Sequence, residues 1–255
     1  MYNSIQDTLI IGKKVVYLPS CHSTNDIAAE IVHAGLFAEG TVVITDNQIK
    51  GRGQRGSEWH ANPGENLTFS VILSPHFLPI QHQFLISQIT ALAVRSFVSN
   101  YIDGVKVKWP NDVLVNGKKI CGILIENSIL GMKLTNSIIG IGVNINQLEF
   151  ENGRATSLAQ ETESQYILAE EFQKLARIIE AYYLKLRTTS HDHDIKLEYL
   201  QHLHGYDQEV KVSFKGQYQN AQVIDVTEQG RLRVKLSSQP DILELGLKEI
   251  EWVLD

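Results

Sequence analysis

The chain has 255 residues, of which 43% are hydrophobic, and its formal net charge at pH 7 is −6. This length allows one substantial domain and a small second one, and the hydrophobic fraction supports a buried core. The negative charge argues against a general affinity for nucleic acid or for an anionic membrane, so any phosphate-binding site must be local. The two cysteines, Cys21 and Cys121, are too few for a disulfide framework and too far apart for a metal-binding pair.

The N-terminal residues do not combine a basic start with a long apolar run, and no window reaches the apolar length of a membrane span. We therefore expect a cytoplasmic protein with no membrane partner. About a dozen residues precede the first predicted strand, which is too few for a helix-turn-helix domain, so we expect no binding to DNA.

Strand and helix patterns alternate through the first half of the chain. Apolar runs predict strands at residues 14–18, 41–45 and 67–73. Ser23 or Thr24 can cap a helix that continues to about residue 33 and ends at Gly35. Residues 79–101 carry apolar side chains on roughly two faces, which predicts a long buried helix.

A hairpin and a further strand complete the predicted sheet. Asn116-Gly117 is typical of a tight turn, and it separates the apolar residues 113–115 from residues 120–125. Residues 134–145 predict another strand. The helical spacing of apolar residues over 172–186 predicts the helix that closes this domain.

From Glu209 onwards the pattern changes to short strands with alternating apolar residues, such as Val210 and Val212. Gly216 and Pro240 supply turns between these strands, which together predict a small β-barrel. The fold class is therefore predicted as α+β. We place a mixed β-sheet with helices in residues 1–205 and the small barrel in residues 206–255.

The most informative motif is GRGQRG at residues 51–56, which is followed by Trp59. Glycines let backbone N–H groups approach a ligand, arginines bind phosphate or carboxylate oxygens, and an indole offers a stacking face. The loop therefore suits a phosphate and a flat ring. Taken alone, it could equally be a solvated turn with salt-bridged arginines or an RNA-binding Arg/Gly segment.

Two later segments carry further motifs. The sequence KWPND at residues 108–112 opens the predicted hairpin, and IGIGVNIN at residues 139–146 is a strand whose alternating glycines admit a ligand or another backbone. Together with Ser23-Thr24-Asn25, these segments resemble biotin–protein ligases over about residues 15–146. Lipoate ligases and octanoyl transferases share the scaffold, but KWPND combined with GRG and GVN is the pattern of the biotin branch.

The resemblance implies a catalytic domain of the class II aminoacyl-tRNA synthetase and biotin ligase type, with an SH3-like C-terminal domain. It implies that ATP activates biotin to biotinyl-5'-AMP, and that biotin then passes to one lysine of a biotin carboxyl carrier protein domain. Mg²⁺ is expected to arrive on the ATP phosphates, because the sequence has no cluster with metal-ligand spacing. A homodimer is an assembly that the resemblance allows.

Both steps concentrate negative charge, so we expect catalysis by positioning and electrostatic stabilisation, with Arg52 and Lys119 as the catalytic residues. The resemblance assigns biotin binding to Ser23, Thr24, Asn25, Gln48, Gly51, Arg52, Gly53, Gln54, Lys119, Gly122 and Gly140. It assigns ATP binding to Arg52, Arg55, Trp59, Asn111, Asp112 and Asn144.

Simpler explanations stand beside several of these roles. Ser23 can be only a helix cap, Trp59 a core residue, and Lys119 a solvated lysine of the hairpin. We expect Cys121 to be a small core residue rather than a thioester nucleophile.

The sequence departs from the family pattern at Gln54, where many relatives have arginine, and Arg55 follows one position later. Either residue could take over the role of that arginine. Ser57 replaces another basic position, and Lys248 is a loose candidate for contacting ATP or the acceptor. The alternative functions are a lipoate or octanoate ligase on the same scaffold and a non-enzymatic RNA-binding module, and the net charge disfavours the second.

Overall fold

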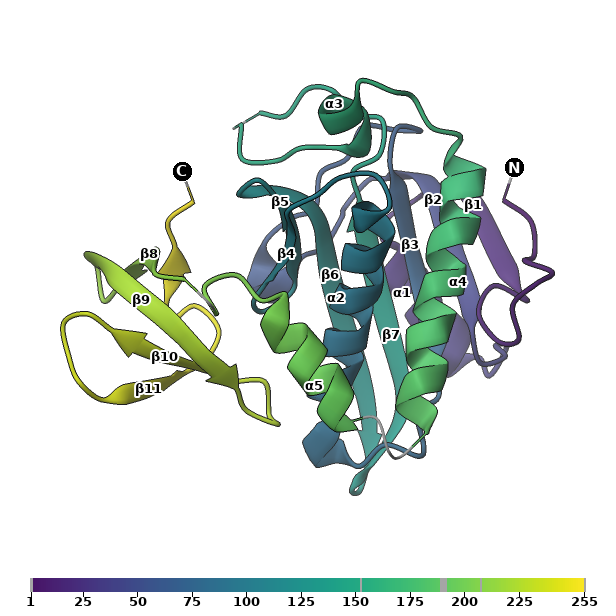
Figure 1. Ribbon diagram of the computed structural model, residues 1–255. Coiled ribbons are helices and arrows are strands. Elements are labelled where there is room, and N and C mark those ends of the chain that lie inside the picture. The colour runs from purple at the N-terminus through teal and green to yellow at the C-terminus, as the bar shows by residue number, and fades with distance from the viewer. Residues whose placement is uncertain (1, 152, 189–191, 207, 255) are drawn as a thin grey trace.

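The computed structural model describes residues 2–151, 153–188, 192–206 and 208–254, and of Arg55 it describes the backbone alone. In these residues, a large mixed sheet with helices is followed by a small antiparallel sheet (Figure 1). The predicted α+β class is thereby confirmed, as is a separate all-β arrangement at the C-terminal end.

The large sheet has seven strands in the order β1-β2-β3-β7-β6-β5-β4. Only β1 and β2 pair in parallel among these neighbours, and the other pairs are antiparallel. The strands are β1 (Val15–Cys21), β2 (Thr41–Gln48), β3 (Leu67–Leu73), β4 (Val105–Lys108), β5 (Asp112–Val115), β6 (Lys118–Leu130) and β7 (Lys133–Val143).

Helices cover both faces of this sheet, which is why its central strands are apolar on both sides (Figure 1). Val42 and Ile44 of β2 belong to the main core, whereas Val43 between them packs in a second cluster with Ala28 of α1. The helices are α1 (Thr24–His33), α2 (Phe84–Ser99), α3 (Leu158–Thr162), α4 (Leu168–Arg187) and α5 (Asp192–Gln201), with 3₁₀ turns η1 (Gln54–Gly56) and η2 (Ile80–His82).

The local sequence patterns locate most of these elements correctly. The predicted strand at 67–73 coincides with β3, and the predicted Asn116-Gly117 turn joins β5 to β6. Both turn residues have positive φ, at 49° and 81°, as a type I′ hairpin turn requires.

The structure differs from the expected elements in one divided helix and in several elements that were not predicted. The single helix expected over 79–101 is divided, because η2 precedes α2 and Gln83 separates them. Strand β4 and helix α5 were not predicted, since β4 has only four residues and only Ile195 and Tyr199 are buried in α5. Strand β11 was also missed, because it follows Pro240 and most of its residues are exposed or half-exposed.

The small sheet has the order β11-β10-β9-β8-β12 and is antiparallel throughout. Before it begins, the chain pairs with the edge of the large sheet: Val107 N–H donates to the His202 carbonyl, and His204 N–H donates to the Val107 carbonyl. The division at residue 205 stays our interpretation. The strands are β8 (Val210–Phe214), β9 (Gln217–Val226), β10 (Leu232–Leu236), β11 (Ile242–Leu245) and β12 (Glu251–Trp252).

The described helices include none with both the length and the apolar character needed to cross a lipid bilayer.

A buried carboxylate on α4 anchors the N-terminal segment. Glu180 is only 6% exposed, and its two oxygens accept hydrogen bonds from the backbone N–H groups of Leu9, Ile10 and Ile11 at 2.6–2.8 Å. Such charge-assisted bonds satisfy three amides that lie away from regular secondary structure.

We expect Glu180→Gln to lower the free energy of unfolding by about 2–4 kcal/mol, because it removes the charge and turns a donor toward backbone donors. Urea denaturation measures this loss. Glu170→Gln, at an exposed position of the same helix, is the matched control. A loss in the Glu180 variant no larger than in the control would show that this anchor does not stabilise the fold.

Candidate active site

A pocket of about 170 Å³ lies where the N-terminus of α1, the 51–59 loop and strands β6 and β7 meet. The structure brings most of the candidate residues to it. The candidates that line it are Ser23, Thr24, Asn25, Gln48, Arg52, Gly53, Gln54, Trp59, Asn111, Asp112, Lys119, Gly122 and Gly140.

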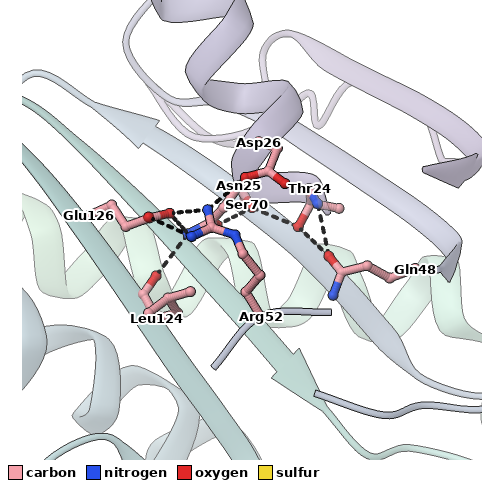
Figure 2. Close-up of polar contacts among 8 residues, drawn as sticks. All are labelled: Thr24, Asn25, Asp26, Gln48, Arg52, Ser70, Leu124 and Glu126. Atoms are coloured by element: carbon pink, nitrogen blue, oxygen red, sulfur yellow. Dashed lines mark hydrogen bonds and ion pairs between the residues drawn. The ribbon is translucent and has the colours of Figure 1, made fainter. Parts of the chain in front are cut away.

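The polar wall of the pocket is a hydrogen-bond network around Asn25 (Figure 2). Ser70 Oγ lies 2.6 Å from Asn25 Oδ1 and 2.7 Å from Thr24 Oγ1. Asn25 Nδ2 donates to Glu126 Oε2 at 2.7 Å and to the Leu124 carbonyl at 3.3 Å. Because the oxygen faces a hydroxyl and the nitrogen faces two acceptors, the orientation of the Asn25 amide is fixed.

Ser23 occupies the N-cap position of α1, but its side chain makes no capping hydrogen bond, so the expected cap is wrong in this respect. Instead, Gln48 Oε1 accepts the Thr24 N–H at 2.8 Å and satisfies one of the free amides of the first helical turn. The Ser23 side chain is buried and lines the pocket. Gln48, which is distant in sequence, thus makes the hydrogen bond that the Ser23 side chain would make as a helix cap.

Three glycines make room for the pocket. A Cβ atom at Gly140 would lie 2.4 Å from Asn25 Oδ1, and one at Gly142 would lie 2.3 Å from the Trp59 ring. A Cβ at Gly122 would lie 3.1 Å from Lys119 Nζ. Trp59 therefore lies directly over the sheet, and its Nε1 is buried without a hydrogen bond to any described atom. The half-buried ring lines a cavity and is not a core residue.

Arg52 lies at the mouth of the pocket between two carboxylates (Figure 2). Its guanidinium binds both oxygens of Glu126 at 2.9 and 2.8 Å and one oxygen of Asp26 at 2.7 Å. The hydrogen bonds to Glu126 outweigh partial burial and raise the pKa of Arg52. The loop that carries it is closed by backbone bonds from Gly53 to Ser57 and from Trp59 to Gly51.

The opposite side of the pocket carries a buried carboxylate between two ammonium groups. Asp112 Oδ1 lies 2.6 Å from Lys119 Nζ, and Oδ2 lies 2.5 Å from Lys108 Nζ. Burial raises the pKa of Asp112, but the charges of Lys119 and Lys108 outweigh it and lower this pKa overall. Asn111 is fixed beside them, because its Nδ2 donates to the Ile123 carbonyl at 2.7 Å.

Of the remaining candidates, Gly51, Asn144 and Lys248 do not line the pocket. Gly51 closes the loop behind Arg52, and Asn144 holds the Thr156 carbonyl through its Nδ2 at 2.9 Å. The side chain of Arg55 lies outside what the structure describes. Lys248 lines a separate groove on the small sheet.

Cys121 is fully buried, and burial raises the pKa of its thiol, so it has none of the thiolate character of a nucleophile. In the part of the chain that the structure describes, no cluster of three His, Cys, Asp or Glu residues could hold a metal ion.

Sequence reasoning missed four residues that shape the site: Asp26, Ser70, Glu126 and Gly142. Two of them had a usable signal. Ser70 is a small polar residue in β3, whose other residues apart from Thr68 are apolar, and Gly142 is the second of two alternating glycines. Asp26 and Glu126 are charged residues of a type common on protein surfaces. Nothing in the sequence indicates that they pair with Arg52, because the fold brings these residues together.

Comparisons with known proteins agree with this geometry. The profile of the protein family described as "Biotin/lipoate A/B protein ligase family" matches residues 17–144. The chain is 36% identical over 142 residues to the bifunctional ligase/repressor BirA of Bacillus subtilis, covering 55% of this chain and 43% of that protein. It is 33% identical over 141 residues to the biotin–[acetyl-CoA-carboxylase] ligase of Mycobacterium tuberculosis, covering 53% and 51%. The matches thus span about half or less of these relatives' lengths.

Solved structures share the fold over nearly the whole chain. The biotin protein ligase from Aquifex aeolicus in complex with biotin and ATP superposes with a TM-score of 0.74 at 24% identity. This match covers 95% of this chain and 100% of that chain. The similarity therefore includes most of the small C-terminal sheet, whereas the family profile ends at residue 144.

We expect Glu126→Gln to loosen the 51–59 loop, because it removes the charge that Arg52 binds with two hydrogen bonds. A half-exposed ion pair contributes about 1 kcal/mol or less, so hydrogen exchange at the Gly53 amide should accelerate by up to about fivefold. Asp26→Asn removes the charge at the single contact and should have the smaller effect. Equal exchange rates in the parent and the Glu126 variant would contradict this role.

Proposed function

The chain belongs to the biotin/lipoate A/B protein ligase family, and on this basis we propose that it is a biotin–protein ligase. It would activate biotin with ATP to biotinyl-5'-AMP and transfer biotin to one lysine of a biotin carboxyl carrier protein domain. The names of its relatives and the biotin and ATP of the Aquifex aeolicus complex support this proposal.

The observation that carries the proposal is one pocket with two chemically different ends. The short polar side chains of Ser23, Thr24 and Asn25 suit a ureido group, which offers one carbonyl acceptor and two N–H donors. The same pocket contains the ammonium group of Lys119, which suits a carboxylate or phosphate. A small neutral ring that carries a carboxylate on an apolar chain matches both ends.

In the first step, a biotin carboxylate oxygen attacks the α-phosphate of ATP, and pyrophosphate leaves. Negative charge builds up on the phosphate oxygens, where Lys119 would stabilise it, while Arg52 would cover the adenylate from the pocket mouth. In the second step, the acceptor amine attacks the acyl carbon, AMP leaves, and an amide bond forms. No nucleophile of the protein is needed, in keeping with the buried thiol of Cys121.

Mg²⁺ would arrive on the phosphates of ATP. Both oxygens of Asp112, the buried carboxylate of the pocket, already contact lysines. Asp112 is thus better suited to orienting Lys119 than to ligating a cation.

The nucleotide would lie beside Trp59, Asn111 and Asp112, with Asn144 shaping the segment at Thr156. Gln54 lines the pocket and can offer a phosphate oxygen a neutral hydrogen bond. Gln54 and Arg55 are the two candidates for the role of the family's second loop arginine. We also propose a cytoplasmic location, with the carrier domain and not DNA as the partner; a homodimer is compatible with the fold.

Pyrophosphate exchange into ATP tests the function, with biotin, lipoate and octanoate compared side by side. We expect exchange that depends on biotin, and a carrier domain that gains biotin on one lysine. Exchange with lipoate or octanoate but not with biotin would instead identify the second activity known for this family.

We expect Lys119→Ala to slow this exchange by about 3–4 kcal/mol of transition-state free energy, while the dissociation constant for biotin changes little. Its charge matters most where charge builds up in the transition state. Lys118→Ala, the exposed neighbour, is the control. Near-normal exchange in the Lys119 variant would refute this role.

We expect Arg52→Gly to release preformed biotinyl-AMP faster than Gln54→Gly does, because only the first change removes a charge-assisted hydrogen bond. The dissociation rate of the adenylate from both variants and the parent measures this. If release were faster from the Gln54 variant, the anion would be held mainly through that residue.

A further inference from the structure

Lys108 is the one member of the Asp112 cluster that does not line the pocket, and the function proposed above leaves it without a role. It pairs with Asp112 across the tip of the β4–β5 hairpin, so the two side chains lie on one face of the sheet. Its side chain is 17% exposed and that of Asp112 is 10% exposed. A lysine so buried needs a carboxylate beside it to compensate its charge.

Each of the two lysines contacts a different oxygen of the Asp112 carboxylate. Lys108 Nζ lies 2.5 Å from Oδ2, whereas Lys119 Nζ lies 2.6 Å from Oδ1. The Lys119 side chain is 36% exposed and lines the pocket. Lys119 reaches Asp112 past Gly122, which is the residue of β6 that pairs with Asp112. Lys119 can therefore turn to an anion in the pocket, while Lys108 has its carboxylate beside it on the neighbouring strand.

If Lys119 moved toward a ligand and Asp112 had no other partner, a buried carboxylate would lose its compensation, which is costly. We propose that Lys108 is a positioning residue: it compensates Asp112, so that the charge of Lys119 is available to the anion that reacts in the pocket. This inference rests on the proposed function for the reaction itself, but the compensation of Asp112 can be tested without any substrate.

The other titratable groups nearby do not replace this charge. On β6, burial raises the pKa of the Cys121 thiol, so this thiol is neutral. After α5, burial together with the charge of Lys108 lowers the pKa of His204, which is therefore neutral near pH 7. Without Lys108, burial would oppose the charge of Lys119 alone, and the pKa of Asp112 would rise.

The first experiment uses the ligand-free protein. The Asp112 carboxyl is titrated by carbon-detected NMR in the parent, Lys108→Met, Lys108→Gln and Lys108→Arg. We expect its pKa to rise by one unit or more in the Met and Gln variants and to stay near the parent value in the Arg variant. Lys106→Met removes the same charge two residues earlier on the same face of β4 and should have a much smaller effect.

The second experiment measures biotin-dependent pyrophosphate exchange against pH. Activity that needs ionised Asp112 is lost as the pH falls through its pKa, so a raised pKa moves the acid limb to higher pH in Lys108→Met and Lys108→Gln. Near pH 7, above the shifted acid limb, we expect kcat to fall at least tenfold because Asp112 then holds Lys119 as its single compensating charge. We expect the KM for biotin to stay within about twofold, and Lys108→Arg to restore most of the rate.

The outcomes separate the two ideas. The role of Lys108 would be overturned if the pKa of Asp112 were the same in the parent and in both neutral Lys108 variants. It would also be overturned if Lys106→Met shifted this pKa as much as the Lys108 variants do. A shifted Asp112 with an unchanged pH profile in an active parent would overturn it too. A parent without biotin-dependent exchange would refute the proposed function, and the ligand-free titration would still decide whether Lys108 compensates Asp112. If Lys108→Met fails to fold, the Gln variant supplies the neutral side chain.

Discussion

The site depends on the lack of side chains at three adjoining positions of the large sheet. Gly122 of β6 pairs with Gly142 of β7, and Gly140 lies two residues earlier on the same strand. A Cβ atom at Gly140 or Gly142 would collide with Asn25 or Trp59, and one at Gly122 would crowd Lys119. The side chains of a central strand normally pack on both faces of a sheet. These glycines lack such packing, and the space admits functional groups instead.

The charges of Arg52, Asp112 and Lys119 at this pocket each have a compensating partner. Arg52 is compensated by Glu126 and Asp26, and Asp112 is compensated by two lysines. An entering anion therefore meets cations whose positions are already set, rather than flexible side chains that it must order. The ligand must therefore compete with these carboxylates for the same arginine and lysine side chains.

The small C-terminal sheet contributes to this arrangement through the hairpin tip. The Nε1 of Trp109 donates to the Gly230 carbonyl at 2.9 Å, and the Nε1 of Trp252 donates to the Trp109 carbonyl at 3.1 Å. Trp109 is therefore held on both sides by the small sheet, directly before Asn111 and Asp112. This contact ties the two parts of the chain together at the residues that line the pocket.

The sequence by itself determined the features that depend on neighbouring residues: the bounds of β3, the Asn116-Gly117 turn and the motifs whose residues meet in the pocket. It also indicated that the glycines of β7 leave room for a close neighbour, which we expected to be a ligand or another backbone and which the structure shows to be the side chains of Asn25 and Trp59. Tertiary structure alone decided that Arg52 meets Glu126, 74 residues away, and that Gln48 rather than Ser23 satisfies the first turn of α1. The physical reason is that propensity and periodicity act over a few residues, whereas these ion pairs and hydrogen bonds follow from which strands pair and in which register.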